Sequence, residues 1–156
     1  MRKVLGFGAL MIVASAAQAD AVPGAAALMS QYTDPARIVA AVNTDFPTTP
    51  GQAVRLSIYD SEEAFLEEAR AKHQALINEE GVAVVSLDGL EPGEYAFAAY
   101  LDENGDGVLN RGKVLGFPKE PVAFSNGITP KLRKPRFDET KISVGPGSVV
   151  VITLED

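Results

Sequence analysis

The residues best suited to chemistry lie in one acidic loop at positions 102–107, with the sequence Asp-Glu-Asn-Gly-Asp-Gly. Asp102, Asn104 and Asp106 occupy alternate positions, and Gly107 follows directly. Oxygen-bearing side chains at the first, third and fifth positions, followed by glycine at the sixth, form the opening half of a calcium-binding loop. The sequence therefore predicts a Ca²⁺ site at this loop.

The second half of this calcium loop is less complete. The Val108 carbonyl is the expected fourth ligand, and Asn110 is a candidate for a further one. Lys113 occupies the twelfth position, where a bidentate glutamate would close the site, so Asn110, Glu120, Asp138 or water must substitute. We therefore expect weak affinity of the extracellular type. The alternative is a plain Asn-Gly/Asp-Gly hairpin turn that needs no metal.

No arrangement of catalytic residues stands out elsewhere. The chain has one histidine, His73, no cysteine, and no serine in a Gly-x-Ser-x-Gly turn. We interpret His73 as a half-exposed residue at a helix end, rather than as an acid/base group or metal ligand. Lys119 and Glu120 are candidate ligand-facing residues, and the alternative is an ion pair that pins their loop.

The first 19 residues have the order of a secretory signal peptide. A basic start is followed by an apolar run, and a small-x-small cleavage site ends at Ala19. The run is short for a membrane-anchoring helix, and no later segment is long enough to span a bilayer. The sequence therefore predicts a periplasmic or secreted protein. Residues 20–35 are expected to be a mobile arm, with a short helix over 25–31 as the alternative.

The mature chain is expected to be strongly acidic. The full sequence has 14 basic and 21 acidic residues, a net charge of −7. Loss of Arg2 and Lys3 with the signal peptide leaves 12 basic residues against 21 acidic, a net charge of −9. Nucleic acid is therefore not an expected partner, and the absence of cysteine excludes a disulfide framework.

The one basic cluster spans Lys131–Arg136. It could meet an anionic partner such as a lipid headgroup or an acidic polysaccharide. The alternative is a solvated loop that offsets the negative field of the domain itself.

Short strands are expected to position the acidic loop. Alternation and β-branched runs predict strands at 37–42, 53–60, 82–87, 93–101, 141–144 and 148–154, the last two as a C-terminal hairpin. Tyr95 and Phe97 are predicted to face the core. Residues 113–126 are predicted to be an ordered loop or edge segment in which Phe117, Val122 and Phe124 are buried.

One helix is predicted between these strands, from Asp60 to about His73. Asp60 can cap the first free N–H groups, and Glu63 lies at the capping-box position. About seven short strands and one short inserted helix predict an all-β fold, an antiparallel Ig-like or transthyretin-like β-sandwich over residues 36–156. A parallel α/β fold is not expected, because no other segment supplies crossover helices.

Several motifs together resemble a known family. Leu90–Tyr95 looks like the turn-and-strand signature of transthyretin-like and collagen-adhesin-B-like sandwiches. The acidic loop resembles the pattern of the exported bacterial domain-of-unknown-function family numbered 2141, and the match extends over Tyr59–Ser61, Phe65, Gly116–Glu120, Phe124–Asn126, Pro135, Phe137 and the final strand. This resemblance implies an exported β-sandwich and no established activity. The chain departs from the usual pattern at 131–136, where a largely neutral loop is more typical.

Two main functions of different classes remain. The first is a non-catalytic exported domain that calcium stabilises and that binds an unknown envelope protein or glycan. The second is an envelope hydrolase that uses carboxylates near the acidic loop, and a purely structural envelope protein is a further alternative. An enzyme needs a concave pocket with two carboxylates in different environments, whereas a binding module shows an exposed apolar patch.

We predict that the mature protein begins at Asp20. N-terminal sequencing of protein from the exported fraction should give Asp-Ala-Val-Pro, the residues that follow the expected cleavage site. Recovery of the intact chain with Met1 from the cytoplasm would contradict the predicted location.

Overall fold

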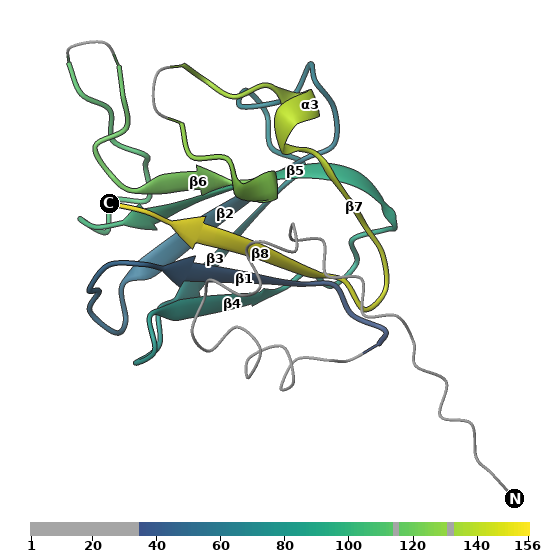
Figure 1. The fold of residues 1–156 in the computed structure, drawn as a ribbon, viewed down its shortest axis with the longest axis horizontal. Helices are drawn as coiled ribbons and strands as arrows, with labels where there is room; N and C mark the ends of the chain where they lie inside the picture. Colours follow the sequence, from purple (N-terminus) through teal and green to yellow (C-terminus); the bar gives the residue numbers. More distant parts are fainter. Residues whose placement is uncertain (1–34, 114–115, 131–132) are drawn as a thin grey trace, which may run out of the picture.

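The computed structural model describes residues 35–113, 116–130 and 133–156, and its fold is an all-β sandwich (Figure 1). One sheet has three strands in the order β4-β1-β8, which are β4 (Val82–Ser86), β1 (Val39–Thr44) and β8 (Val149–Leu154). The other sheet has five strands, four of which follow the order β3-β2-β5-β6. Their ranges are β3 (Ala71–Leu76), β2 (Ala53–Tyr59), β5 (Gly93–Asp102) and β6 (Val122–Phe124). The fifth strand, β7 (Ile142–Val144), pairs with the first part of β5.

The strand pairs are antiparallel with one exception. β1 runs parallel to β8, with Val39 opposite Val149 and Thr44 opposite Leu154. β2 lies between β3 and β5 and pairs with both in antiparallel register. The sandwich expected from the sequence is therefore confirmed, and its departure from a purely antiparallel arrangement is the β1–β8 pair.

The core lies between the two sheets and follows the alternation of each strand. Val54, Leu56 and Ile58 of β2 point inward and are at most 1% exposed. Tyr95 and Phe97 of β5 belong to the same cluster and are 6% and 0% exposed, as the sequence predicts. Burial of these side chains supplies the main favourable term for folding.

The predicted helix from Asp60 to His73 is wrong. Residues 61–70 form a series of turns in which Leu66 has φ 64°, and the chain then continues as strand β3. Asp60 binds Arg70 at 2.8 Å instead of capping a helix, and the Arg70 amide donates to the Ile58 carbonyl at 2.8 Å. The physical reason is a period of two in residues 71–76, which packs alanines against the core while lysine and glutamine face outward.

The predicted C-terminal hairpin is also wrong. β7 pairs with β5 and β8 pairs with β1, so the turn between them carries the chain from one sheet to the other. In the segment 113–126, β6 is an edge strand paired with Ala98–Tyr100, and its Val122 and Phe124 are buried as predicted. Phe117, by contrast, is 38% exposed rather than buried. The described helices are a 3₁₀ turn at Ser125–Gly127 and α3 at Phe137–Thr140.

The predicted signal peptide, and the arm up to residue 34, lie outside the described residues. Within the part of the chain that the structure describes, no helix is long and apolar enough to cross a membrane.

We predict that Phe97→Ala lowers the free energy of unfolding by about 3–5 kcal/mol, because a fully buried aromatic ring leaves a cavity. The matched control is Phe117→Ala, which removes a 38% exposed ring and should change stability by less than about 0.5 kcal/mol. Denaturant unfolding of the two variants gives both values. Equal effects of the two substitutions would contradict the assigned face of β5.

Candidate binding groove and its acidic loop

A groove of about 670 Å³ lies on the outer face of the five-stranded sheet. Its floor contains Ser57 of β2 and Ala98 of β5, which are opposite one another in the strand register. Both side chains are small and face away from the core, so the sheet surface is low at this point. The neighbouring cross-strand pair, Arg55 and Tyr100, is larger and bounds the floor on one side.

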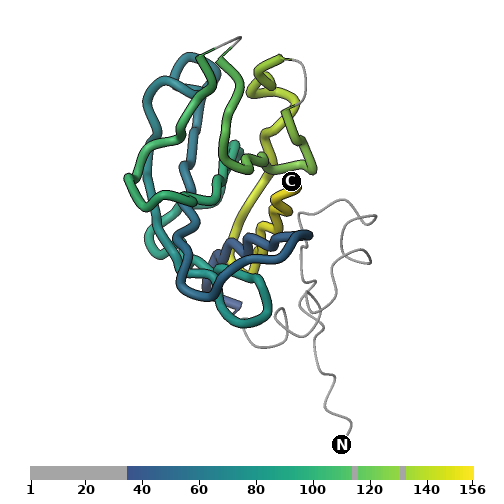
Figure 2. Tube along the Cα trace, turned by 90° about the vertical axis from the view of Figure 1, so that its left-hand side faces the viewer, coloured from purple at the N-terminus to yellow at the C-terminus, as the bar shows by residue number. Residues whose placement is uncertain are grey.

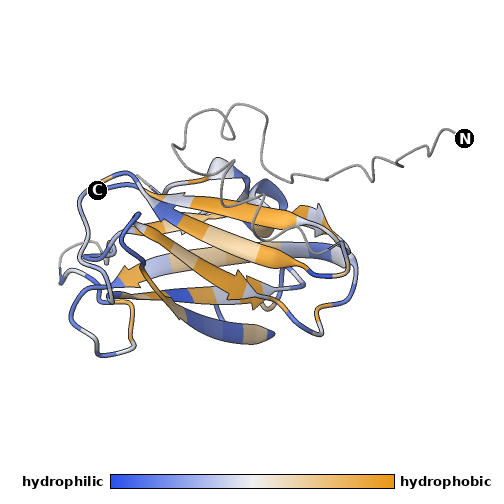
Figure 3. Cartoon of the chain, turned by 90° about the horizontal axis from the view of Figure 1, so that it is seen from below, coloured by the Kyte–Doolittle hydropathy of each residue, from blue (hydrophilic) through white to orange (hydrophobic). Residues whose placement is uncertain are grey.

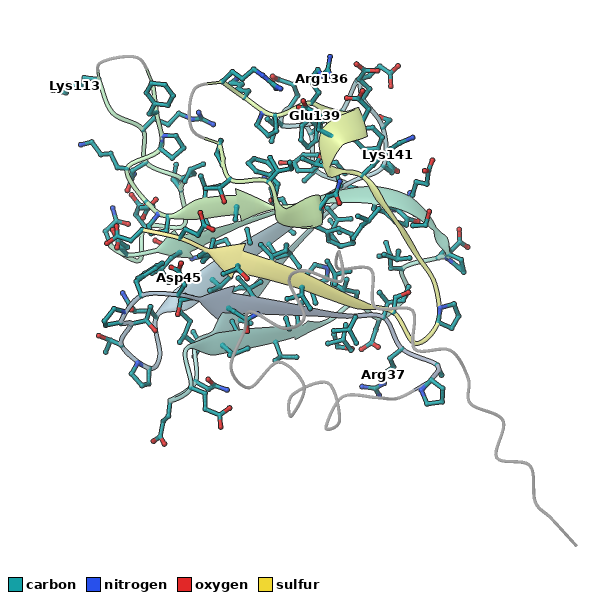
Figure 4. The ribbon with its side chains drawn as sticks, viewed as in Figure 1. Arg37, Asp45, Lys113, Arg136, Glu139 and Lys141 are labelled. Atoms are coloured by element: carbon teal, nitrogen blue, oxygen red, sulfur yellow. The ribbon has the colours of Figure 1, made fainter. Side chains whose placement is uncertain are left out.

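Two loops rise at the same end of the molecule beside this floor. Figures 1 and 2 show the β5–β6 loop and the segment before α3 extending beyond the sheet, and Figure 4 marks them by Lys113 and by Arg136 with Glu139. The β5–β6 loop contributes Val108 and Phe117 to the groove, 60% and 38% exposed. Exposed apolar side chains beside a concave surface are typical of a ligand-binding site.

An aromatic cluster forms the other boundary of the groove. The Phe65 ring packs edge-on against Tyr59, Phe124 and Phe137, with ring centroids 5.3, 6.1 and 5.9 Å apart. Phe65 therefore holds the 61–70 turn and α3 against the sheet. Burial raises the pKa of the Tyr59 phenol.

Asp102 anchors the acidic loop to the sheet. One carboxylate oxygen, Oδ2, accepts hydrogen bonds from Arg55 Nε at 3.1 Å and from the Gly107 amide at 2.9 Å, and Arg55 Nη2 lies 3.0 Å away. The Asp102 side chain is 0% exposed, and its second oxygen, Oδ1, is buried without a hydrogen-bond partner. Gly107 has φ 77°, and a Cβ there would lie 3.3 Å from Arg55 Nη2, so glycine suits this contact.

Glu120 connects two backbone segments of the same loop through hydrogen bonds. Its carboxylate accepts hydrogen bonds from the Glu103 amide at 3.1 Å and the Asn110 amide at 2.9 Å, and the residue is 5% exposed. Lys119 is exposed, and it borders a second hollow of about 460 Å³ together with Glu120. Of the two candidate ligand-facing residues, Lys119 is therefore accessible to solvent, whereas Glu120 is buried and stabilises the backbone of the loop.

Asn104, Asp106 and Asn110 come together on the exposed side of the loop. The Asn104 amide nitrogen lies 2.6 Å from Asn110 Oδ1 and 3.1 Å from Asp106 Oδ2, and Asn110 Nδ2 lies 3.0 Å from the same Asp106 oxygen. Hydrogen bonds from the Asn110 side chain and the Val108 amide lower the pKa of Asp106. A half-turn of each amide group would present three oxygens at this point.

The candidate calcium ligands therefore fall into two groups. Asp106, Asn104 and Asn110 cluster together, Val108 contributes its amide to Asp106 at 2.9 Å, and Asp102 is bound to Arg55 below them. Within the described ranges, no three His, Cys, Asp or Glu side chains converge closely enough to hold a metal ion. The donor set at this cluster would offer Ca²⁺ one carboxylate, Asp106, beside amide and carbonyl oxygens, which is a low-affinity composition.

Two other sequence interpretations have a definite place in the fold. His73 is half-exposed as predicted, but it lies in β3 opposite Leu56 rather than at a helix end. In the basic cluster, Arg133 forms a two-pronged ion pair with Glu139, and this contact lowers the pKa of Glu139 to about 2.

The groove residues themselves were missed by sequence reasoning. Arg55, Ser57 and Tyr100 occupy the outward positions of two strands, and Lys72 lies on a segment that was assigned to a helix. The alternation of Arg55, Ser57 and Tyr59 with apolar residues was the available signal for an outer face, but it does not say that this face is hollow.

The fold and groove define this chain as a β-sandwich domain with a concave outer face. Residues 44–152 match the family described as an uncharacterized protein conserved in bacteria (DUF2141), and the chain belongs to that family. No curated protein matches the chain.

We predict that Asp102→Ala lowers the free energy of unfolding by about 3 kcal/mol, because it leaves Arg55 and the Gly107 amide without their shared acceptor. Asp88→Ala is the matched control, since its 69% exposed carboxylate lies 4.0 Å from Arg37, and it should cost less than about 1 kcal/mol. Chemical unfolding measures both. Similar costs would show that the buried pair does not anchor the loop.

Proposed function

We propose that this chain is a non-catalytic domain, exported to the periplasm or beyond, that binds a component of the cell envelope in the groove. The observation that carries the proposal is the groove itself, with its small floor residues and exposed Val108 and Phe117. Its volume of about 670 Å³ is within the range of small-molecule sites. The basic, apolar and small-residue order of the first 19 residues supports export.

The placement of the carboxylates supports a binding role over the hydrolase alternative. Asp102 is bound to Arg55, and Glu120 accepts hydrogen bonds from two backbone amides. Among the described residues that line the groove, Glu67 is the one acidic side chain. A hydrolase of the expected kind would place two carboxylates with different environments in the same pocket.

We also propose that the acidic loop binds Ca²⁺ weakly on its exposed side. The Asp106 carboxylate and the amide oxygens of Asn104 and Asn110 would be the ligands, with the Val108 carbonyl as a fourth. The unpartnered Oδ1 of Asp102 is the oxygen through which that residue would join them. Arg55 already neutralises Asp102, so calcium would gain little from this carboxylate, and we expect low affinity.

The groove proposal is tested by filling its floor. Purified wild-type protein is incubated with envelope lipid and glycan fractions, and the retained molecules are identified by mass spectrometry. Ala98→Phe should reduce retention at least about tenfold, whereas Ser143→Phe, at a small and exposed outward residue of β7 outside the groove lining, should not. Equal retention by Ala98→Phe would exclude the groove, and no retention by wild type would favour a purely structural protein.

The calcium proposal is tested by thermal unfolding in calcium and in chelator. At a concentration about 100 times the dissociation constant, calcium should stabilise the wild type by about 2.7 kcal/mol. Asp106→Ala should abolish this response, and Asp45→Ala, which removes an exposed carboxylate elsewhere, should keep it. Identical wild-type curves in the two buffers would leave the metal-free hairpin turn as the better account.

A further inference from the structure

The groove carries a charge opposite to that of the protein. Eleven of the 14 basic residues are described, the exceptions being Arg2, Lys3 and Lys131, and 19 of the 21 acidic residues are described, the exceptions being Asp20 and Asp34. Five of those eleven basic residues line the groove against one of the 19 acidic ones, Glu67. The basic residues are Arg55, Lys72, Arg111, Arg133 and Lys134.

Internal ion pairs account for two of these five cations. Arg55 is paired with Asp102, and Arg133 is paired with Glu139. Lys72, Arg111 and Lys134 have no acidic partner among the described residues, and all three are exposed. They come from three different walls, which are β3, the β5–β6 loop and the segment before α3. Three unpaired cations around one groove repel one another, and an anion between them would remove that cost.

The same groove also has an apolar part. Val108 and Phe117 expose hydrocarbon surface to the groove, and Ser57 and Ala98 leave depth beneath it. We propose that the ligand of this groove is a small organic anion with an apolar body and a carboxylate- or phosphate-type head group. This proposal rests on the groove being the binding site. The apolar body would contact Val108 and Phe117, and the head group would lie between the unpaired cations.

A matched pair of dyes separates charge from hydrophobicity. 1-Anilinonaphthalene-8-sulfonate and N-phenyl-1-naphthylamine share one apolar body and differ by the sulfonate. We expect fluorescence titration to show that the folded protein binds the sulfonate at least about tenfold more tightly. Dodecanoate should displace the sulfonate dye, and dodecanol should displace it at least about tenfold less well.

Charge removal then locates the site. The triple variant Lys72→Gln/Arg111→Gln/Lys134→Gln should lose the preference for the sulfonate dye. Lys113→Gln/Lys119→Gln/Lys141→Gln removes the same charge outside the groove lining and should keep it. Circular dichroism and a melting curve confirm that each variant is folded. Equal binding of both dyes by wild type would overturn the anionic ligand and leave the groove proposal intact, whereas binding of neither dye would count against both.

The other side of the sandwich has an apolar outward face instead. Val39 and Ala41 of β1 and Val149 and Val151 of β8 alternate with core residues and point away from the core. Val149 and Val151 form an apolar cluster separate from the main core. Figure 3 shows the strands of this three-stranded sheet coloured hydrophobic over most of their length.

Discussion

The buried Asp102 carboxylate is the contact on which the functional end of this protein depends. It ends β5, accepts hydrogen bonds from Arg55 of β2 and from Gly107, and so ties the sheet to the loop that forms one wall of the groove. An ionised carboxylate out of water is tolerated only with such partners, which leaves the loop little freedom to move away. The same contact neutralises Arg55, so the cations left to meet a ligand come from β3, the β5–β6 loop and the segment before α3.

Ser125 plays the corresponding part on the opposite wall. Its buried hydroxyl accepts a hydrogen bond from the Phe97 amide at 2.9 Å and donates to the Thr140 carbonyl at 2.5 Å. These contacts join the end of β6 and α3 to the central strand, and the Phe65 ring packs against both. The groove is therefore formed by walls that are separately fixed to one sheet, which is the condition for a site that exists before its ligand arrives.

The sequence predicts most strands because the alternation of apolar and polar residues is a local pattern. The prediction fails where the pairing of distant strands decides the structure. Residues 71–76 follow an acidic run that suits a helix start, yet Ala71 and Ala75 pack on the core only if the segment extends beside β2. β7 and β8 are adjacent in sequence, but they do not pair with each other. β7 pairs with β5 in one sheet, and β8 pairs with β1 in the other. The groove could not be foreseen, because Ser57 and Ala98 become neighbours only through the β2–β5 register. The acidic loop can be predicted from the sequence, since its oxygen-bearing side chains and glycine lie within six consecutive residues.

We propose that the groove on the five-stranded sheet is a preformed site for an anion with an apolar body. Amide chemical shifts of the ¹⁵N-labelled mature protein, followed during titration with dodecanoate, test this proposal most directly. We expect saturable shifts at Ser57, Lys72, Ala98 and Tyr100, with the amides of β1, β4 and β8 unchanged. Shifts confined to the three-stranded sheet, or no saturable shifts at all, would contradict it.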